Sequence, residues 1–330
     1  MLIEAFTEAK VSSAPDTNED RFVILPGRAY AVIDGVTDRL GTRYNGMLSG
    51  QYAASIVKEA IECALTGPNR PADMKALIAV LTQAIADAYR EHDVLDAART
   101  DCNYRFSSTL AVALMGEATI EIALVGDSGI RINGSRILQV DKDLDLITST
   151  LRQKAWPVIG ARTSDPEIQE KTSRRVTWFG TRQPHESLAD ILEPQDLAWI
   201  EERAVAACVQ ALPHVPQSDI EALVRGGIVN AQGAYQNDAS TILGYSALDG
   251  FEIPSSLVHF ERIPRADVET IELFSDGYFR PGADFGVASW EEAFRDVERE
   301  DPSKVILYPS PKGSTAKHWT DDRTYLGVKL

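Results

Sequence analysis

Residues 29–35 read Ala-Tyr-Ala-Val-Ile-Asp-Gly, an apolar run that ends abruptly in a carboxylate and a glycine. Residues 21–25 form a second apolar run just before it, and the turn pair Pro26-Gly27 separates the two. This pattern predicts two β-strands joined by a tight turn. Because the second strand ends in an aspartate, Asp34, its carboxylate is expected at the edge of a sheet.

Three other acidic motifs lie beside apolar, strand-like runs. They are Asn18-Glu19-Asp20, Asp276-Gly277 and Asp321-Asp322. Strands that end in this way can bring their carboxylates into one oxygen-rich cluster. Without a partner those charges would repel one another, and a hard divalent cation such as Mg²⁺ or Mn²⁺ is the partner that carboxylate oxygens favour. The sequence therefore predicts chemistry at a metal centre.

Six short motifs follow one another along the chain. In order they are Asn18-Glu19-Asp20, Ala31-Val32-Ile33-Asp34-Gly35, Ser107-Ser108-Thr109, Val125-Gly126-Asp127-Ser128, Ser275-Asp276-Gly277 and Asp321-Asp322-Arg323-Thr324. This ordered set resembles the metal-dependent protein phosphatases of the PP2C (PPM) family, and most of all its bacterial members. The resemblance covers essentially the whole chain. Each motif alone is weak, since Asp-Gly also occurs at Asp249-Gly250, where a turn is the ordinary interpretation.

The resemblance implies an α+β fold, a four-layer α-β-β-α sandwich of two mainly antiparallel sheets flanked by helices. It implies one phosphatase domain over residues 1–330, with the metals where the edges of the two sheets meet. Residues 46–65 and 71–91 carry apolar residues at helical spacing, which suggests helices lying on a sheet. The hairpin signal Asn133-Gly134 favours antiparallel pairing over a Rossmann-type parallel sheet.

The segment from about residue 144 to 233 diverges most from the family and is the candidate for a substrate-facing flap. Within it, residues 195–212 and 218–229 are predicted to be helical, while the pattern of the rest is less regular. Beyond it, residues 240–245 are predicted to be a strand.

The resemblance also implies the ligands of two ions, Mn²⁺ or Mg²⁺, and of a third, weaker one. Asp34 would bind both main ions, and the backbone carbonyl of Gly35 would bind one of them. Asp276 and Asp321 would complete the shell of the other ion. Asp127, together with Asp276, would hold the third. An ordinary Asp-Gly turn, a charged strand cap and a β-turn aspartate are the structural alternatives for these positions.

Asp20 and, through water, Glu19 are expected to orient waters bound to the ions. The expected reaction is direct attack of a hydroxide that bridges the two ions on phosphoserine or phosphothreonine, with no phosphoenzyme. The partner would be a phosphorylated protein, such as a serine/threonine kinase or its targets. Asp238 remains an alternative to Asp321 as a ligand, because residues 238–241 imitate the Asp-x-x-Thr pattern that begins at Asp321.

Two departures from the family pattern concern the substrate phosphate and the leaving group. The arginine that grips the phosphate in many members is replaced by Pro15, and Arg21, Arg39 or Arg43 are the candidates to replace it. The histidine that follows Asp-Gly in animal members is replaced by Val36. These departures favour an alternative function, a PP2C-like pseudophosphatase with weak or no catalytic activity that acts as a binding or regulatory module.

The formal net charge of −16 argues against a nucleic-acid or anionic-membrane partner, because no basic run offsets it. The same charge disfavours a two-metal nuclease. The chain start has neither a basic segment nor an apolar one of the kind found in secretory signals. The cysteines Cys63, Cys102 and Cys208 are far apart and form no Cys-x-x-Cys pair. A cytoplasmic location is therefore expected.

Overall fold

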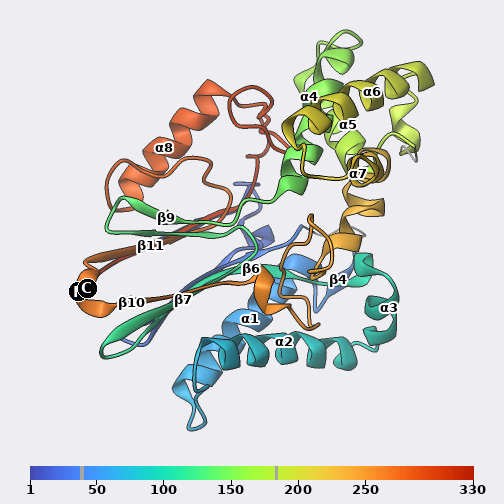
Figure 1. Ribbon diagram of the computed structural model, residues 1–330. Helices are drawn as coiled ribbons and strands as arrows, with labels where there is room; N and C mark the ends of the chain where they lie inside the picture. The colour runs from blue at the N-terminus through green and yellow to red at the C-terminus, as the bar shows by residue number, and fades with distance from the viewer. Residues whose placement is uncertain (38–40, 183–184) are drawn as a thin grey trace.

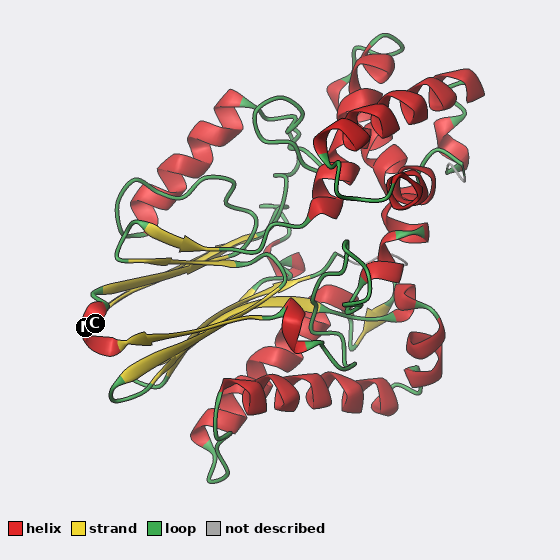
Figure 2. Cartoon of the chain, in the orientation of Figure 1, coloured by secondary structure: helices red, strands yellow, loops and turns green. Residues whose placement is uncertain are grey.

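The computed structural model describes residues 1–37, 41–182 and 185–330. Two β-sheets lie face to face at the centre of the molecule, with helices on both outer sides (Figure 1). A group of helices from the middle of the chain lies at one end of the sandwich, away from the chain termini (Figures 1 and 2). No helix in the described part of the chain combines the length and apolar character that a membrane crossing requires.

The first sheet has the strand order β1-β12-β11-β8-β9, and all its neighbours pair antiparallel. Its strands are β1 (Leu2–Glu8), β12 (Arg323–Lys329), β11 (Thr270–Phe274), β8 (Gly129–Ile132) and β9 (Arg136–Leu138). β1 was not predicted from the sequence. Leu2 pairs with Lys329, so the two ends of the chain lie together at one end of this sheet (Figure 1).

The second sheet has the order β10-β7-β6-β3-β2 and is also antiparallel throughout. Its strands are β10 (His259–Pro264), β7 (Thr119–Val125), β6 (Ser108–Met115), β3 (Ala29–Gly35) and β2 (Arg21–Leu25). Tyr30 and Val32 of β3 pack into the core between the sheets, while Ala31 and Ile33 pack on the other face against helices. Because both faces of β3 are buried, its sequence is a continuous apolar run.

Two long helices, α1 (Ser49–Thr66) and α2 (Met74–Glu91), cover the outer face of the second sheet. The first sheet is covered by α8 (Val287–Glu300), whose Trp290 packs against Phe274 of β11 and whose Phe294 belongs to the same hydrophobic cluster. These layers confirm the predicted α-β-β-α sandwich. The remaining short elements are α3 (Leu95–Thr100), the two-stranded hairpin β4 (Arg43–Tyr44) and β5 (Met47–Leu48), and 3₁₀ turns at Pro15–Thr17, Cys102–Tyr104, Glu186–Leu188, Gln232–Tyr235, Ser255–Leu257 and Arg265–Asp267.

Four helices that lie between strands β9 and β10 in the sequence form a helical unit, which has its own hydrophobic cluster. They are α4 (Asp143–Gly160), α5 (Pro166–Phe179), α6 (Pro194–Ala211) and α7 (Gln217–Asn230). The sequence pattern predicted α6 and α7 but not α4 and α5. In α4 the buried face includes Thr148, Ser149 and Arg152, so the apolar period that would have marked the helix is interrupted.

The predicted strand at residues 240–245 is wrong. The structure places turns there, with one isolated bridge between Gln236 and Tyr245. Asp238 Oδ1 accepts hydrogen bonds from the backbone N–H and the hydroxyl of Ser240, at 2.8 and 2.6 Å. Such local bonds from a side chain to the backbone favour a turn over a sheet ladder, which explains the difference.

Candidate metal centre

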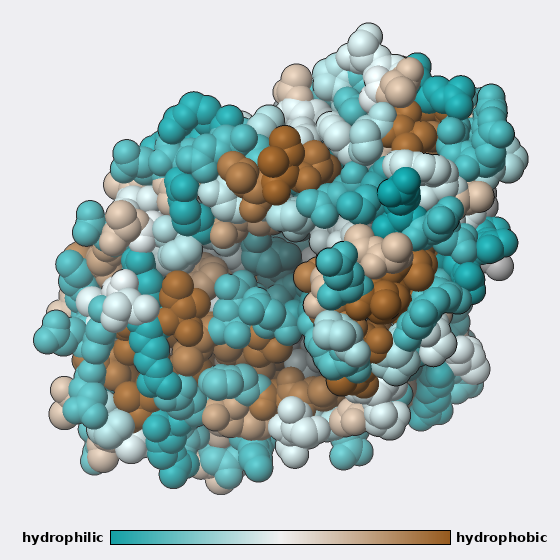
Figure 3. Space-filling view, turned by 45° about the horizontal axis from the view of Figure 1, so that its top comes forward, coloured by the Kyte–Doolittle hydropathy of each residue, from teal (hydrophilic) through white to brown (hydrophobic). Residues whose placement is uncertain are grey.

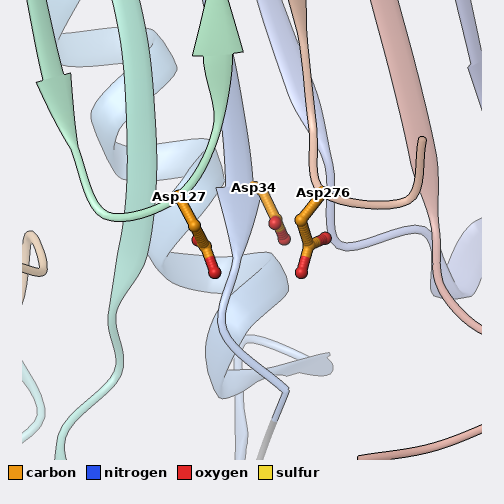
Figure 4. Close-up of side chains that lie close together, drawn as sticks. All are labelled: Asp34, Asp127 and Asp276. Atoms are coloured by element: carbon orange, nitrogen blue, oxygen red, sulfur yellow. The ribbon is translucent and has the colours of Figure 1, made fainter. Parts of the chain in front are cut away.

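Three carboxylates from separate parts of the chain meet at one end of the sandwich. Asp34 lies near the end of β3, Asp127 in the turn that joins β7 to β8, and Asp276 just after β11. One carboxylate oxygen from each lies within 4.8 Å of the others. Figure 4 shows the three side chains projecting to the same side, from segments of both sheets. We call this group the carboxylate cluster.

Glycines allow the backbone to approach closely beside the cluster. A Cβ atom on Gly35 would lie 2.4 Å from the carbonyl oxygen of Gly50, so only a glycine lets the end of β3 rest on the first turn of α1. Gly126, before Asp127, has a φ of +80°, and a Cβ there would lie 2.6 Å from Thr109 Cγ2. These close backbone contacts fix the positions from which the side chains of Asp34 and Asp127 project.

The cluster lines a cavity of about 460 Å³, here called the central cavity. Its wall combines the ends of both sheets, the helical unit and the loop at residues 309–312. Asp321, Lys142 and Lys312 line it together with the cluster. The face drawn in Figure 3 is hollowed near its centre, with hydrophilic side chains at the bottom and hydrophobic ones on part of the rim.

Burial and repulsion between carboxylates make the ionised forms of Asp34 and Asp276 unfavourable. Burial, followed by the charges of Asp276 and Asp20, raises the pKa of Asp34 well above its usual value. Burial and the charge of Asp321 likewise raise the pKa of Asp276. Closely spaced carboxylate oxygens of this kind are the donor set that a hard divalent cation prefers. The residues present therefore fit such an ion.

Two lysines extend into the same region. Lys142 Nζ lies 2.6 Å from Asp127 Oδ2 and 3.3 Å from Asp145 Oδ2. Burial alone would lower the pKa of Lys142, but the charges of Asp127 and Asp145 outweigh it and raise that pKa well above the usual value. Lys142 is therefore charged at neutral pH, beside the carboxylate cluster.

Asp321 lies in the central cavity but is engaged by lysines. Its carboxylate forms an ion pair with Lys312 and lies 3.5 Å from Lys10 Nζ. Burial would raise the pKa of Asp321, but the charges of Lys312 and Lys10 outweigh burial and lower it. The structure thus places Asp321 beside the expected ligands and gives it a different electrostatic partner.

Asp20 and Glu19 are both buried, and each retains an unsatisfied oxygen. Asp20 Oδ2 accepts a hydrogen bond from the Ser275 hydroxyl at 2.7 Å, and Glu19 Oε2 lies 2.6 Å from Lys10 Nζ. Burial and the charge of Asp322 raise the pKa of Asp20 to about 7. The other oxygen of each carboxylate, Asp20 Oδ1 and Glu19 Oε1, has no hydrogen-bond partner among the described residues. A water or an ion bound at each of these oxygens would satisfy it.

The arginines named from the sequence do not line the central cavity where they are described. Arg21 Nη1 donates to the backbone carbonyls of Asn18 and Asp20, at 2.8 and 2.7 Å. Arg43 Nη1 donates to the Gly46 carbonyl at 2.8 Å. Arg39 lies outside the described residues.

Lys142 and Lys312 are the cationic side chains in the central cavity wall among the described residues, and the sequence analysis named neither. No motif spacing connects them to the acidic residues. Asp238, the alternative to Asp321, lies in the turn described above and does not line the cavity.

The chain matches no protein-family model and no curated protein. It is similar to solved structures of bacterial phosphatases. One is the serine/threonine phosphatase PstP/Ppp of Mycobacterium tuberculosis, with 17% identity, a TM-score of 0.44, and coverage of 100% of this chain and 98% of that one. Another is a PstP catalytic domain in complex with two manganese ions, with 15% identity, a TM-score of 0.45, and coverage of 99% and 97%.

A third similar structure is PppA of Pseudomonas aeruginosa, described as a key regulatory component of a type VI secretion system. The identity is 12%, the TM-score 0.42, and the coverage 99% of this chain and 96% of that one. Because the sequence identities and TM-scores are low, a function for this chain has to be inferred from the residues of the site itself.

Proposed function

We propose that this chain is a metal-dependent protein phosphatase of the PP2C type, which removes phosphate from phosphoserine or phosphothreonine in proteins. The observation that carries the proposal is the carboxylate cluster, in which three aspartates from distant segments bring oxygens within 4.8 Å of one another in an open cavity. Such repelling charges are costly in a fold unless a cation is bound there.

Four residues of the site would serve as ligands of the two main ions. Asp34 would be shared by two Mn²⁺ or Mg²⁺ ions, with the Gly35 carbonyl and the side chains of Asp276 and Asp321 as further ligands. Asp127, in the carboxylate cluster, would bind a third ion. When bound, the ions neutralise the phosphoryl oxygens and acidify a water so that it can serve as the nucleophile near neutral pH.

Side chains of the protein would bind and orient the substrate and the water. Lys142 and Lys312 line the central cavity, so they are placed to attract a dianionic phosphate. Asp20 has an unsatisfied oxygen, so it would accept a hydrogen bond from a water bound to the ions and orient it. Glu19 would hold a water in place through its own unsatisfied oxygen.

One observation favours the alternative, a pseudophosphatase that binds phosphoproteins without hydrolysing them. Lys312 and Lys10 already neutralise Asp321, which in the first proposal is a metal ligand. In a pseudophosphatase these lysines would neutralise the carboxylate of Asp321 in place of a metal ion. Metal-dependent hydrolysis of p-nitrophenyl phosphate distinguishes the two functions, because only the first requires it.

Hydrolysis of p-nitrophenyl phosphate by the purified protein tests the proposal. Activity should appear with Mn²⁺, vanish in EDTA and return when Mn²⁺ is restored. Asp34→Asn should lower kcat by about a hundredfold or more, since it removes the shared ligand. Hydrolysis that survives EDTA, or near-normal turnover by Asp34→Asn, would refute the assigned mechanism. Metal binding without any hydrolysis would support the pseudophosphatase.

A further inference from the structure

A second cavity, of about 540 Å³, adjoins the central cavity. Thr37, Trp178, Lys312 and Thr320 line both. Its wall combines the segment after β1, the C-terminal half of α5 in the helical unit, and the loop at residues 312–320. A chain that places one residue in the central cavity could therefore place a neighbouring residue in this one. We call it the cationic cavity.

Positive side chains dominate the wall of the cationic cavity. Lys10, Arg174, Arg175 and Lys312 line it, and no carboxylate does so among the described residues. Lys10 and Lys312 form ion pairs with Glu19 and Asp321, so the two arginines carry the charge that remains for a ligand. This is unexpected in a chain with a net charge of −16, where acidic residues outnumber basic ones over the whole sequence. A cavity with cationic walls in an acidic protein concentrates anions locally.

Arg174 and Arg175 have guanidinium groups available for a ligand. Arg174 is exposed and Arg175 is half-buried. Neither forms an ion pair or a side-chain hydrogen bond with any described residue. By contrast, Arg152 of the same helical unit is buried and bound to Glu170. Guanidinium groups bind carboxylates and phosphates through two parallel hydrogen bonds. Two neighbouring arginines without ion-pair partners therefore fit an anionic ligand.

Aromatic rings form the other part of the wall. Trp178, Phe179 and Trp319 line the cationic cavity, and Trp178 also lines the central cavity. Flat rings of this kind can pack against the backbone and the methylene groups of a peptide while the arginines bind its charges. The wall therefore suits an acidic peptide better than a small inorganic anion.

We propose that the cationic cavity binds acidic side chains that flank the phosphorylated residue of a protein substrate. The inference rests on the proposed function, because it assumes that the phosphorylated residue enters the central cavity. It names the substrate class, phosphoproteins with aspartate or glutamate near the phosphorylated position. The helical unit, through Arg174 and Arg175, acts as the specificity element.

A binding experiment tests the cavity without catalysis. A glutamate-rich peptide without phosphate is titrated into the protein in EDTA, and binding is followed by the change in tryptophan fluorescence, to which Trp178 and Trp319 in the cavity wall contribute. The variant Arg174→Gln/Arg175→Gln should bind about tenfold more weakly, as expected for lost charge-assisted hydrogen bonds. The control Arg70→Gln/Arg295→Gln removes two exposed arginines outside the cavity, with the same change in charge, and should bind as the wild type does.

A kinetic experiment connects the cavity to the reaction. Two phosphopeptides are compared, one with glutamates and one with glutamines beside the phosphorylated residue. The wild type and the control should show a kcat/KM about tenfold higher for the acidic peptide, and Arg174→Gln/Arg175→Gln should lose that preference mainly through KM. Hydrolysis of p-nitrophenyl phosphate, which has no flanking residues, should be the same in all three.

The outcomes separate the two proposals. Equal binding of the glutamate peptide by the wild type and Arg174→Gln/Arg175→Gln overturns the cationic cavity as a substrate subsite. So does an equal kcat/KM for the two phosphopeptides in an enzyme that hydrolyses p-nitrophenyl phosphate. Failure to hydrolyse any ester refutes the proposed function instead, and the peptide titration in EDTA then still decides whether the cavity binds acidic segments.

Discussion

Asp276 and Asp321 line the same cavity, yet their pKa values move in opposite directions. Burial and neighbouring carboxylates raise the pKa of Asp276. For Asp321 burial acts in the same direction, but the charges of Lys312 and Lys10 overcome it. Two residues that look alike in the sequence therefore differ in how readily they would give up a proton to bind a cation, because their neighbours differ.

Asp321 and Asp238 begin similar sequence patterns, but the structure gives them different surroundings. We predict that Asp321→Ala lowers kcat for phosphate-ester hydrolysis by about tenfold or more, since it removes a proposed ligand and leaves Lys312 without its partner. Asp238→Ala should change kcat by less than about twofold, because it removes only local bonds to Ser240. Steady-state kinetics of both variants, with thermal unfolding as a control, tests this. A larger effect of Asp238→Ala would exchange the two assignments.

At the scale of elements, a buried arginine ties the helical unit to the loop that carries Lys312. Arg152 of α4 donates from Nη1 to the carbonyls of Ser303, Lys304 and Ser310, at 2.7, 3.2 and 3.2 Å. It also forms an ion pair with Glu170 of α5. Glu170 in turn accepts a hydrogen bond from the backbone N–H of Gly313 at 3.0 Å. The walls of both cavities are therefore joined through one buried network.

Arg152→Met should destabilise the protein by about 3–5 kcal/mol, because Glu170 and three carbonyls lose their partner in the interior. Urea unfolding measures the change. The double variant Arg152→Met/Glu170→Gln should recover part of it, since no uncompensated charge remains buried. A loss below about 1 kcal/mol in the single variant would mean that the network does not hold the loop.

At the scale of the whole molecule, the end of the sandwich collects more acidic charge than basic charge can balance. Asp20, Asp34 and Asp276 all have pKa values raised first by burial and then by one another or by other carboxylates. The fold therefore accepts an electrostatic cost at this one site in the absence of cations. The continuous apolar cores of the sheets and helices stabilise the fold against that cost.

The raised pKa values make the stability of the metal-free protein depend on pH. A carboxyl whose pKa is raised by folding contributes stability that is fully present below its unfolded pKa, about 4, and is lost as pH rises through its folded pKa. For Asp20 that folded pKa is about 7. We therefore predict that the free energy of unfolding in EDTA falls by at least about 1 kcal/mol between pH 5 and pH 8.

Urea unfolding at several pH values in EDTA measures this dependence. Asp321, whose pKa is lowered, titrates below that window and does not offset the effect. Saturating Mn²⁺ should reduce the fall, because cations bind the ionised carboxylates and compete with protons. Asp34→Asn should flatten the metal-free profile. A metal-free stability that rises from pH 5 to pH 8 would contradict the electrostatic description of the site.

Local pattern accounts for much of the fold. Residues 29–35 are apolar on both faces and end in Asp-Gly, so the buried strand β3 and its terminal carboxylate followed from the chain itself. The apolar spacing of α1 and α2 likewise predicted helices on a sheet. Helices α4 and α5 escaped prediction because threonine, serine and arginine occupy buried positions there and find partners only in the folded protein.

The sequence by itself determined which residues are acidic, which strands they end and in which order they come. That Asp34, Asp127 and Asp276 face one another was decided by the packing of two sheets, since more than ninety residues separate each from the next in the chain. The positions of Lys312, Arg174 and Arg175 beside the cavities were likewise decided by the tertiary structure. Electrostatic interaction depends on distance through space, and residue spacing along a chain carries that information only within one helix or strand.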